Sequence, residues 1–299
     1  MKKYYHLFSN GADAKDFILD RHDYLAAFNR IGVCAANNDA TVLAFAIEDT
    51  HVHILLYGEH DACLDFKLLY TKSSRMYISL TRDNRSDAEF NMDMDEIDDE
   101  SYLKNVAAYT IIQPTKDGRP VMFYDYFWGT GSMYFRSEKH IPIWHIDKYG
   151  NIKSPVAVKN LSVTDKRRIF RTRTYDIPEE WLVCNDILLP SNYVDVKRFE
   201  SIFGTHNAFR CYTANNKEKN KIVLDRMAKV RGVELDEGEM RLACASMSRN
   251  LFGQNDIRKL DVTKRITLAR EIRKIYGISF SQLSRRIHMP ETELRKYLK

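Results

Sequence analysis

Two histidines, His51 and His53, lie two residues apart in the segment THVHILL, whose other residues after Thr50 are apolar. Side chains alternate across a β-strand, so on one strand both imidazoles point to the same face. Two neutral imidazoles a few ångströms apart can hold a divalent metal ion that prefers nitrogen and oxygen ligands. An isolated pair is more often one surface and one core histidine, but apolar neighbours make two imidazoles without partners costly to bury. The pair is therefore a candidate metal site.

A second group of reactive side chains lies in SYLKNVAAYTIIQP. Tyr109 and Gln113 are four residues apart, so on a helix they share one face. A tyrosine hydroxyl can attack phosphorus and form a covalent intermediate, and an amide oxygen one turn away is a suitable third metal ligand. Tyr102, two turns earlier, competes for the role of nucleophile. The chain has 17 tyrosines, and most helical tyrosines only pack, so this motif does not establish a chemistry by itself.

The elements around these motifs predict an α+β fold. Apolar periodicity and turn residues indicate alternating strands and helices before Pro114, which disfavours helical geometry in the residue before it. We expect an antiparallel sheet with helices on one face. The expected elements are strands at Tyr4–Ser9, Thr41–Ile47 and His51–Tyr57, helices at Asp16–Ala36, Asp61–Leu80 and from about Asp98 to Gln113, and an acidic loop at Asp87–Glu100 with at most one short strand.

The C-terminal segment has the layout of a helix-turn-helix over about residues 264–299. A first helix is expected to end at Gly277, and Ser279–Gln282 reads as a capping box for a second helix through about Ile287. His288–Pro290 forms the turn, and Glu291–Leu298 forms the third helix. The side chains expected to remain outside the small core and to contact DNA are Arg285, Arg286, Arg295 and Lys296. A solvated basic helical hairpin is the alternative.

The bulk composition restricts the class of protein. The formal net charge is +5, and five scattered cysteines without a CxxC pair argue for a reducing cytoplasm and against a disulfide framework. Neither a signal peptide nor a membrane-spanning segment is expected, so we predict a soluble, cytoplasmic protein without a membrane partner. We divide the chain into a core at 1–136, an unassigned mixed region at 137–215 and a helical region at 216–299.

Taken together, these stretches resemble the single-tyrosine HUH transposases, and among them the REP-associated tyrosine transposases of the IS200-like group. The resemblance covers about residues 4–135. It rests on the opening YYHLFSNG, the strand-borne THVHILL, the helix YTIIQP, which is similar to the family's YIxxNP signature, and FYDYFWGTGSMY, which is similar to its aromatic-Trp-Ser-Ser-Tyr segment.

The resemblance implies a ferredoxin-like HUH nuclease core, with the tyrosine helix packed across the histidines of a central strand. It makes His51, His53 and Gln113 the ligands of Mg²⁺ or Mn²⁺, and Tyr109 the nucleophile that forms a 5′-phosphotyrosine with single-stranded or hairpin DNA. Members of the family act as monomers or as homodimers that exchange the tyrosine helix. This sequence departs from the pattern at Gln113, where Asn is usual, at Thr50, and at Trp128-Gly129-Thr130.

Three alternatives remain open at this point. The first is a catalytically silent, DNA-binding regulator on a degenerate HUH core. The second is another HUH class, a replication initiator or relaxase. The third is an unrelated hydrolase in which a metal ion activates water. Attachment of product DNA to the protein under denaturing conditions excludes the first and the third, because neither a regulator nor a hydrolase leaves an adduct. The second ranks lower because such enzymes typically place the tyrosine differently and carry larger or additional domains.

Overall fold

The computed structural model describes residues 1–9, 17–82, 90–115, 122–137, 140–171, 176–214, 217–230, 237–276 and 280–298. The chain forms two compact units, Met1–Val223 and Leu224–Lys299. The elements of the first unit are β1 (Lys3–Ser9), α1 (Arg21–Ala36), β2 (Thr41–Ile47), β3 (Val52–Gly58), α2 (His60–Thr81), β4 (Met92–Ile97), α3 (Glu100–Ile112), β5 (Val156–Ala157), α4 (Val163–Phe170), β6 (Leu182–Cys184), β7 (Ile187–Leu188), α5 (Val196–Phe203) and α6 (His206–Thr213). Helix α7 (Lys217–Val230) runs across the boundary, and the second unit continues with α8 (Glu237–Phe252), α9 (Val262–Tyr276), α10 (Phe280–Ile287) and α11 (Glu291–Tyr297).

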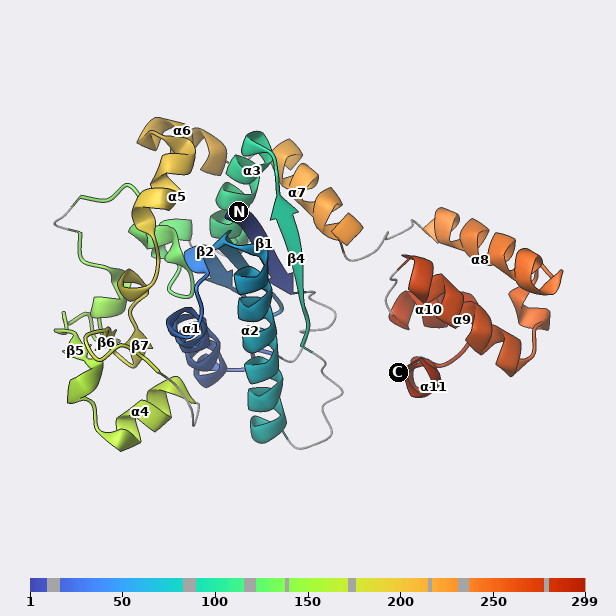
Figure 1. The fold of residues 1–299 in the computed structure, drawn as a ribbon, viewed down its shortest axis with the longest axis horizontal. Coiled ribbons are helices and arrows are strands. Elements are labelled where there is room, and N and C mark those ends of the chain that lie inside the picture. Colours follow the sequence, from blue (N-terminus) through green and yellow to red (C-terminus); the bar gives the residue numbers. More distant parts are fainter. Residues whose placement is uncertain are drawn as a thin grey trace. The chain divides into compact units, whose positions relative to one another are not determined.

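The main sheet of the first unit is antiparallel, with the strand order β2-β3-β1-β4. Figure 1 labels β1, β2 and β4 of this sheet. Strands β1 and β3 are therefore central. Their positions are buried almost without interruption, because apolar side chains point to both faces and neither face can be left in water. The predicted α+β class with an antiparallel sheet is confirmed.

Helices cover both faces of this sheet. Phe28 of α1 packs against Phe45 of β2, and Phe45 lies opposite Ile54 of β3. His53 precedes Ile54 and so points to the opposite face, where its ring meets Tyr109 of α3. The expectation of helices on one face is therefore wrong: α1 packs on one face and α3 on the other, because β1 to β3 bury side chains on both.

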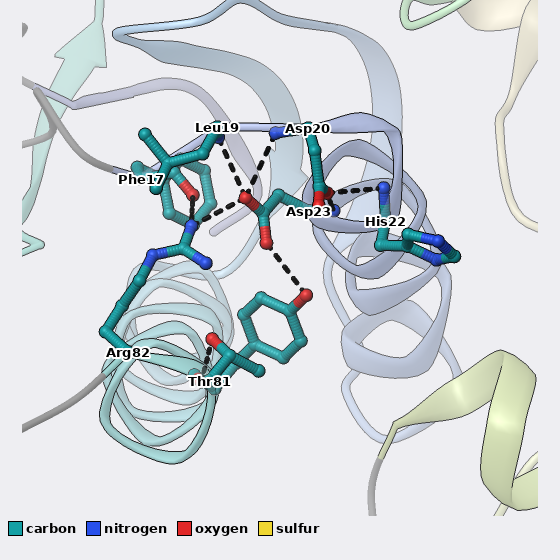
Figure 2. A network of polar contacts seen from close by, with 8 residues as sticks. Phe17, Leu19, Asp20, His22, Asp23, Thr81 and Arg82 are labelled. Carbon is teal, nitrogen blue, oxygen red and sulfur yellow. Dashed lines mark hydrogen bonds and ion pairs between the residues drawn. The ribbon is translucent and has the colours of Figure 1, made fainter.

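The start of α1 is held by a polar network around Asp23 (Figure 2). Asp20 and Asp23 form a capping box, so the helix begins at Arg21 rather than at the expected Asp16. Asp23, which is only 2% exposed, also accepts from Arg82 at 2.6 Å and from the Tyr77 hydroxyl at 2.9 Å. Burial raises the pKa of Asp23, but these hydrogen bonds outweigh it and hold the pKa below its ordinary value.

The acidic segment before α3 was expected to be a loop with at most one short strand, and it contains one strand, β4, of six residues at the edge of the sheet. Its carboxylates have partners elsewhere in the fold. Glu96 contacts Lys3 and accepts from the Tyr5 hydroxyl at 3.2 Å, while Asp95 is buried. The expected loop residues 87–89 lie outside the described residues.

Residues 140–214, which the sequence left unassigned, belong to the first unit. A small sheet with the order β5-β6-β7 is joined to α1 through the buried side chain of Asn29. Its amide donates to the carbonyls of Ile169 and Asp186 at 3.0 and 2.8 Å, and its oxygen accepts from the Leu188 amide at 2.9 Å. Three backbone groups from distant segments thus converge on one side chain.

The second unit is a small helical domain, as expected for this part of the chain. Its core joins all four helices α8 to α11 and consists of Cys244, Leu260, Leu268, Ala269, Ile272, Leu283, Ile287, Met289 and Leu294. Helices α10 and α11 match the second and third helices predicted at the C-terminus, and Leu298 packs partly buried against the core. The predicted cap at Gly277 and Ser279 lies outside the described residues.

Candidate active site

His53 is the centre of the candidate site, because both of its ring nitrogens have partners. It is 1% exposed on the central strand β3. Its Nε2 lies 3.1 Å from Nε2 of Gln113, and its Nδ1 lies 3.1 Å from Nε2 of His6. An amide nitrogen only donates, so His53 Nε2 accepts the Gln113 hydrogen and the neutral ring carries its proton on Nδ1. That proton is donated to His6, which fixes both the tautomer and the orientation of the ring.

Tyr109 lies beside these imidazoles on α3. Its ring is perpendicular to that of His53 at a centroid distance of 5.5 Å, and it also meets His6 at 6.5 Å. Helix α3 begins at the N-cap Asp99 and ends where Gln113 opens a 3₁₀ turn before Pro114. The helix therefore brings the predicted nucleophile and the predicted third ligand to the same imidazole, as their spacing of four residues requires.

His51 precedes β3 instead of lying on it. Its ring is perpendicular to that of His53 with the centroids 5.5 Å apart, so the two imidazoles lie on the same side of the sheet, as expected. The Nδ1 of His51 is 2.6 Å from the hydroxyl of Thr50, and its Nε2 is 3.6 Å from a carboxylate oxygen of the buried Glu48. At 24% exposure of its side chain, His51 is the predicted ligand through which solvent reaches the site.

Tyr102, the competing nucleophile, has a different environment. Its hydroxyl donates to Asp95 of β4 at 3.1 Å, and both side chains are buried. A tyrosine with a carboxylate acceptor on the neighbouring strand has a packing role that needs no substrate. The structure thus separates the two tyrosines of α3 by their neighbours: imidazoles for Tyr109 and a carboxylate for Tyr102.

The structure adds three buried residues that the sequence did not single out. They are His6, Glu48 and Asp95. His6 and Asp95 are cross-strand partners, and the alternation of side chains along β1 places His6 on the face of Phe8, which pairs with His53. Strand alternation was thus the available signal for His6, but only the register of β1 against β3 shows that it reaches His53.

The spacing of the two predicted imidazole ligands fits a common metal ion. Imidazole nitrogens bind metals at about 2.1 Å, so two rings on one ion have centroids about 4.5 to 5.5 Å apart at ordinary bond angles; the rings of His51 and His53 are 5.5 Å apart. Two ligand atoms on an octahedral ion lie about 3 Å apart; the 3.1 Å between Gln113 and His53 joins the amide nitrogen, which is not a ligand atom, to Nε2 of the imidazole. A half-turn of the amide brings its oxygen to face His53. Two imidazoles and oxygen donors suit Mn²⁺ or Mg²⁺.

A metal site made only of the usual strong ligands is not found in the described part of the chain. No three or more histidine, cysteine, aspartate or glutamate side chains there are grouped so as to hold a metal ion. The predicted set has only two such residues, since its third member is the amide of Gln113.

The segment FYDYFWGTGSMY closes the edge of the sheet next to the site. The backbone carbonyl of Trp128 accepts from Ile47 of β2 at 2.9 Å, and the hydroxyl of Tyr126 donates to the carbonyl of Ile47 at 2.6 Å. Ile47 is the last residue before the turn that leads to His51. These bonds therefore fix the end of β2 from which that turn starts.

The four basic residues predicted to contact DNA are distributed unevenly on α10 and α11. Arg285 and Lys296 are exposed, whereas Arg286 is half-buried. The half-buried Arg295 donates to Glu291 at 2.8 and 3.0 Å and lies over the ring of Phe280 at 4.7 Å. Arg285 and Lys296 are thus the most accessible of the four to a phosphate backbone.

No protein-family model, no curated protein and no solved structure matches this chain. Within the described residues, no helix combines the length and the apolar composition needed to cross a lipid bilayer.

Proposed function

We propose that this chain is an enzyme that cuts and rejoins DNA strands through a covalent bond to a tyrosine. The observation that carries the proposal is the contact of one buried imidazole, His53, with both Tyr109 and Gln113 of α3. Within this class we propose a single-tyrosine HUH transposase. The element order β1-α1-β2-β3-α2-β4 with the sheet order β2-β3-β1-β4 supports the ferredoxin-like core that such an enzyme requires.

In this proposal, His51, His53 and Gln113 hold Mg²⁺ or Mn²⁺, which supplies positive charge beside the scissile phosphate. The hydroxyl oxygen of Tyr109 attacks phosphorus in line with the departing 3′ oxygen. A tyrosine–phosphorus bond forms and the bond from phosphorus to the 3′ oxygen breaks, which leaves a 5′-phosphotyrosine and a 3′-hydroxyl that has gained a proton. Attack by a 3′-hydroxyl on the phosphotyrosine reverses these steps and transfers the strand.

The remaining residues of the site position these groups. His6 holds the His53 ring with its Nε2 toward Gln113. His51 is the part of the site exposed to solvent, so the phosphate approaches from its side. Tyr109 is only 2% exposed, so the reaction requires that the side chains covering its hydroxyl move when DNA binds.

The test is a denaturing gel after incubation with labelled single-stranded hairpin oligonucleotides from the DNA that flanks the gene, with Mn²⁺ or Mg²⁺. We expect a labelled band at the combined mass of protein and DNA, which a chelator abolishes. The Tyr109→Phe variant is expected to lose the band completely and to retain DNA binding. Tyr102→Phe, the matched control from the same helix, should keep it; an adduct lost in Tyr102→Phe and kept in Tyr109→Phe would reverse the assignment.

The burial of Tyr109 also favours a second candidate, a DNA-binding regulator that does not cut. The same gel distinguishes the two functions. Binding without cleavage on every flanking hairpin would support the regulator, and metal-dependent cleavage without an adduct would support a hydrolase.

A further inference from the structure

A cleft of about 530 Å³ lies in the first unit, on the side of the sheet that carries α1. Its walls come from the start of α1, from the aromatic segment after α3 and from the region that the sequence left unassigned. The lining residues that matter are Arg21, Phe127, Lys148 and Tyr149. None of them belongs to the site around His53.

One wall of the cleft is a stack of a cation on aromatic rings. The guanidinium carbon of the exposed Arg21 lies 5.5 Å from the ring centroids of both Phe127 and Trp128. On α1, Tyr24 stacks on Trp128 at 4.8 Å with an interplanar angle of 14°. The buried indole of Trp144 donates to the carbonyl of Phe127 at 2.9 Å, which holds the backbone of this wall in place.

The other wall is the tip of a tight hairpin. The carboxylate of Asp147 accepts from the backbone amides of Tyr149 and Asn151 at 2.9 and 2.8 Å, and the Asp147 carbonyl accepts from Gly150 at 3.0 Å. The backbone amide of Asn151 is the main cause that lowers the pKa of Asp147 to about 2. The hairpin therefore presents Tyr149, which is 76% exposed, in a fixed position, with the ammonium of Lys148 over its ring at 4.8 Å.

The charged side chains that line this cleft favour an anionic ligand. Its two acidic residues have cationic partners: Asp147 pairs with Lys153 at 3.3 Å and Asp186 with Arg168 at 2.5 Å. Arg21 and Lys148 form no ion pair with any of the described residues. Exposed rings next to cations are the combination with which proteins stack unpaired bases and hold their phosphates.

The cleft is connected to the candidate active site through the turn between β2 and β3. Trp128 accepts from Ile47 at the end of β2, and Tyr24, which stacks on Trp128, donates to Asp49 in the turn. His51 follows two residues after Asp49.

We propose that the cleft between Tyr149 and the wall formed by Arg21 and Phe127 binds an unpaired base, with its phosphate, of single-stranded DNA. The inference rests on the proposed function and adds a separate recognition site to it. A paired base cannot enter, because stacking on Tyr149 requires that the base leave its own stack.

The test measures equilibrium binding of a fluorescent oligo-dT of about 20 nucleotides to the full-length protein by anisotropy. We expect Tyr149→Ala to raise Kd about 10-fold and Arg21→Ala to raise it about 5-fold, whereas Tyr149→Phe, which keeps the ring, should bind within about twofold of the wild type. The fluorescence of a single 2-aminopurine in the strand should be quenched on binding, and the quenching should be lost in Tyr149→Ala.

Tyr124→Ala is the matched control. Tyr124 is also an exposed tyrosine, and the guanidinium of Arg136 lies over its ring, but it lies outside the cleft.

The outcomes separate this inference from the proposed function. If the wild type forms the covalent adduct and Tyr149→Ala binds oligo-dT as the wild type does, the cleft has no role and the inference is wrong. If no adduct forms but binding depends on Tyr149, the inference stands and the enzymatic proposal fails. Absence of binding to oligo-dT by the wild type, or the same loss with duplex DNA or in Tyr124→Ala, would also overturn it.

Discussion

At the scale of single residues, the candidate site depends on how His53 is oriented. Its Nε2 can accept from Gln113, or bind a metal, only while its proton stays on Nδ1, and His6 is the acceptor that keeps it there. Partners of this kind set the tautomer and the orientation of metal-binding histidines. His6 is therefore a positioning residue, one strand away from the residues that it serves.

We predict that His6→Leu weakens Mn²⁺ binding by about 10- to 100-fold, because His53 loses the acceptor for its Nδ1 proton. His6→Gln, which can still offer an oxygen, should recover part of the affinity. Titration of the full-length protein followed by the electron paramagnetic resonance of free Mn²⁺ measures both. His60→Asn is the control, since His60 is an exposed histidine on α2; equal Mn²⁺ affinity in His6→Leu and the wild type would contradict the role.

At the scale of elements, the network at the start of α1 couples two segments that the sequence separates by 59 positions. We predict that Asp23→Asn lowers the free energy of unfolding at neutral pH by about 3 kcal/mol, because it leaves the guanidinium of Arg82 without its charged partner. Urea denaturation measures the change. Asp65→Asn, at an exposed position of α2, should change it by less than about 0.5 kcal/mol.

The same pair predicts a pH dependence. The pKa of Asp23 is lower in the folded chain than its ordinary value, so its contribution is present above the unfolded pKa of about 3.9 and is lost as the pH falls through the folded pKa. Urea titrations below about pH 4 should show a smaller loss of stability on acidification in Asp23→Asn than in the wild type. Equal slopes in the two proteins would show that Asp23 is not the group that titrates.

The elements also show which parts of the fold can be predicted from the sequence alone. Strands β1 to β3 and helix α3 were predicted to within a residue or two, because burial patterns and caps are local signals. The short strand that was allowed in the acidic segment is β4, but its place in the sheet could not be predicted, because its acidic residues have partners far along the chain, such as Tyr5 for Glu96. The packing of residues 140–214 could not be predicted, since it depends on contacts between segments far apart in the sequence. Asn29 of α1 meets three backbone groups of this region, and Val33 and Ala36 of α1 pack against its apolar cluster. Gln113 was found from the sequence because it lies four residues after Tyr109 on the same helix. His6 was not found, because it reaches His53 only through the pairing of two strands that are far apart in the sequence.

At the scale of the whole molecule, the basic charge is concentrated in the second unit, whereas the candidate active site belongs to the first. Residues 256–299 hold 12 lysines and arginines and 5 aspartates and glutamates, a local charge of +7 against +5 for the whole chain. The core of the second unit includes Cys244 of α8 as well as residues of α9 to α11. Removing only residues 255–299 would therefore leave α8 without most of this core, and substitutions in the full chain test the DNA contacts more cleanly than that truncation.

We predict that the double variant Arg285→Ala/Lys296→Ala binds duplex DNA less tightly and with a weaker dependence on salt. Each phosphate contact contributes about −0.9 to the slope of log K against log salt concentration, so losing two contacts should reduce the slope by about 1.8. Anisotropy titrations of the full-length protein at several salt concentrations measure both quantities. Lys72→Ala/Lys159→Ala removes the same net charge from exposed positions of the first unit and should leave the slope unchanged. If the two double variants reduce the slope equally, the effect belongs to the net charge of the protein and α10 and α11 make no phosphate contacts; if only the first reduces it, these helices bind the DNA backbone.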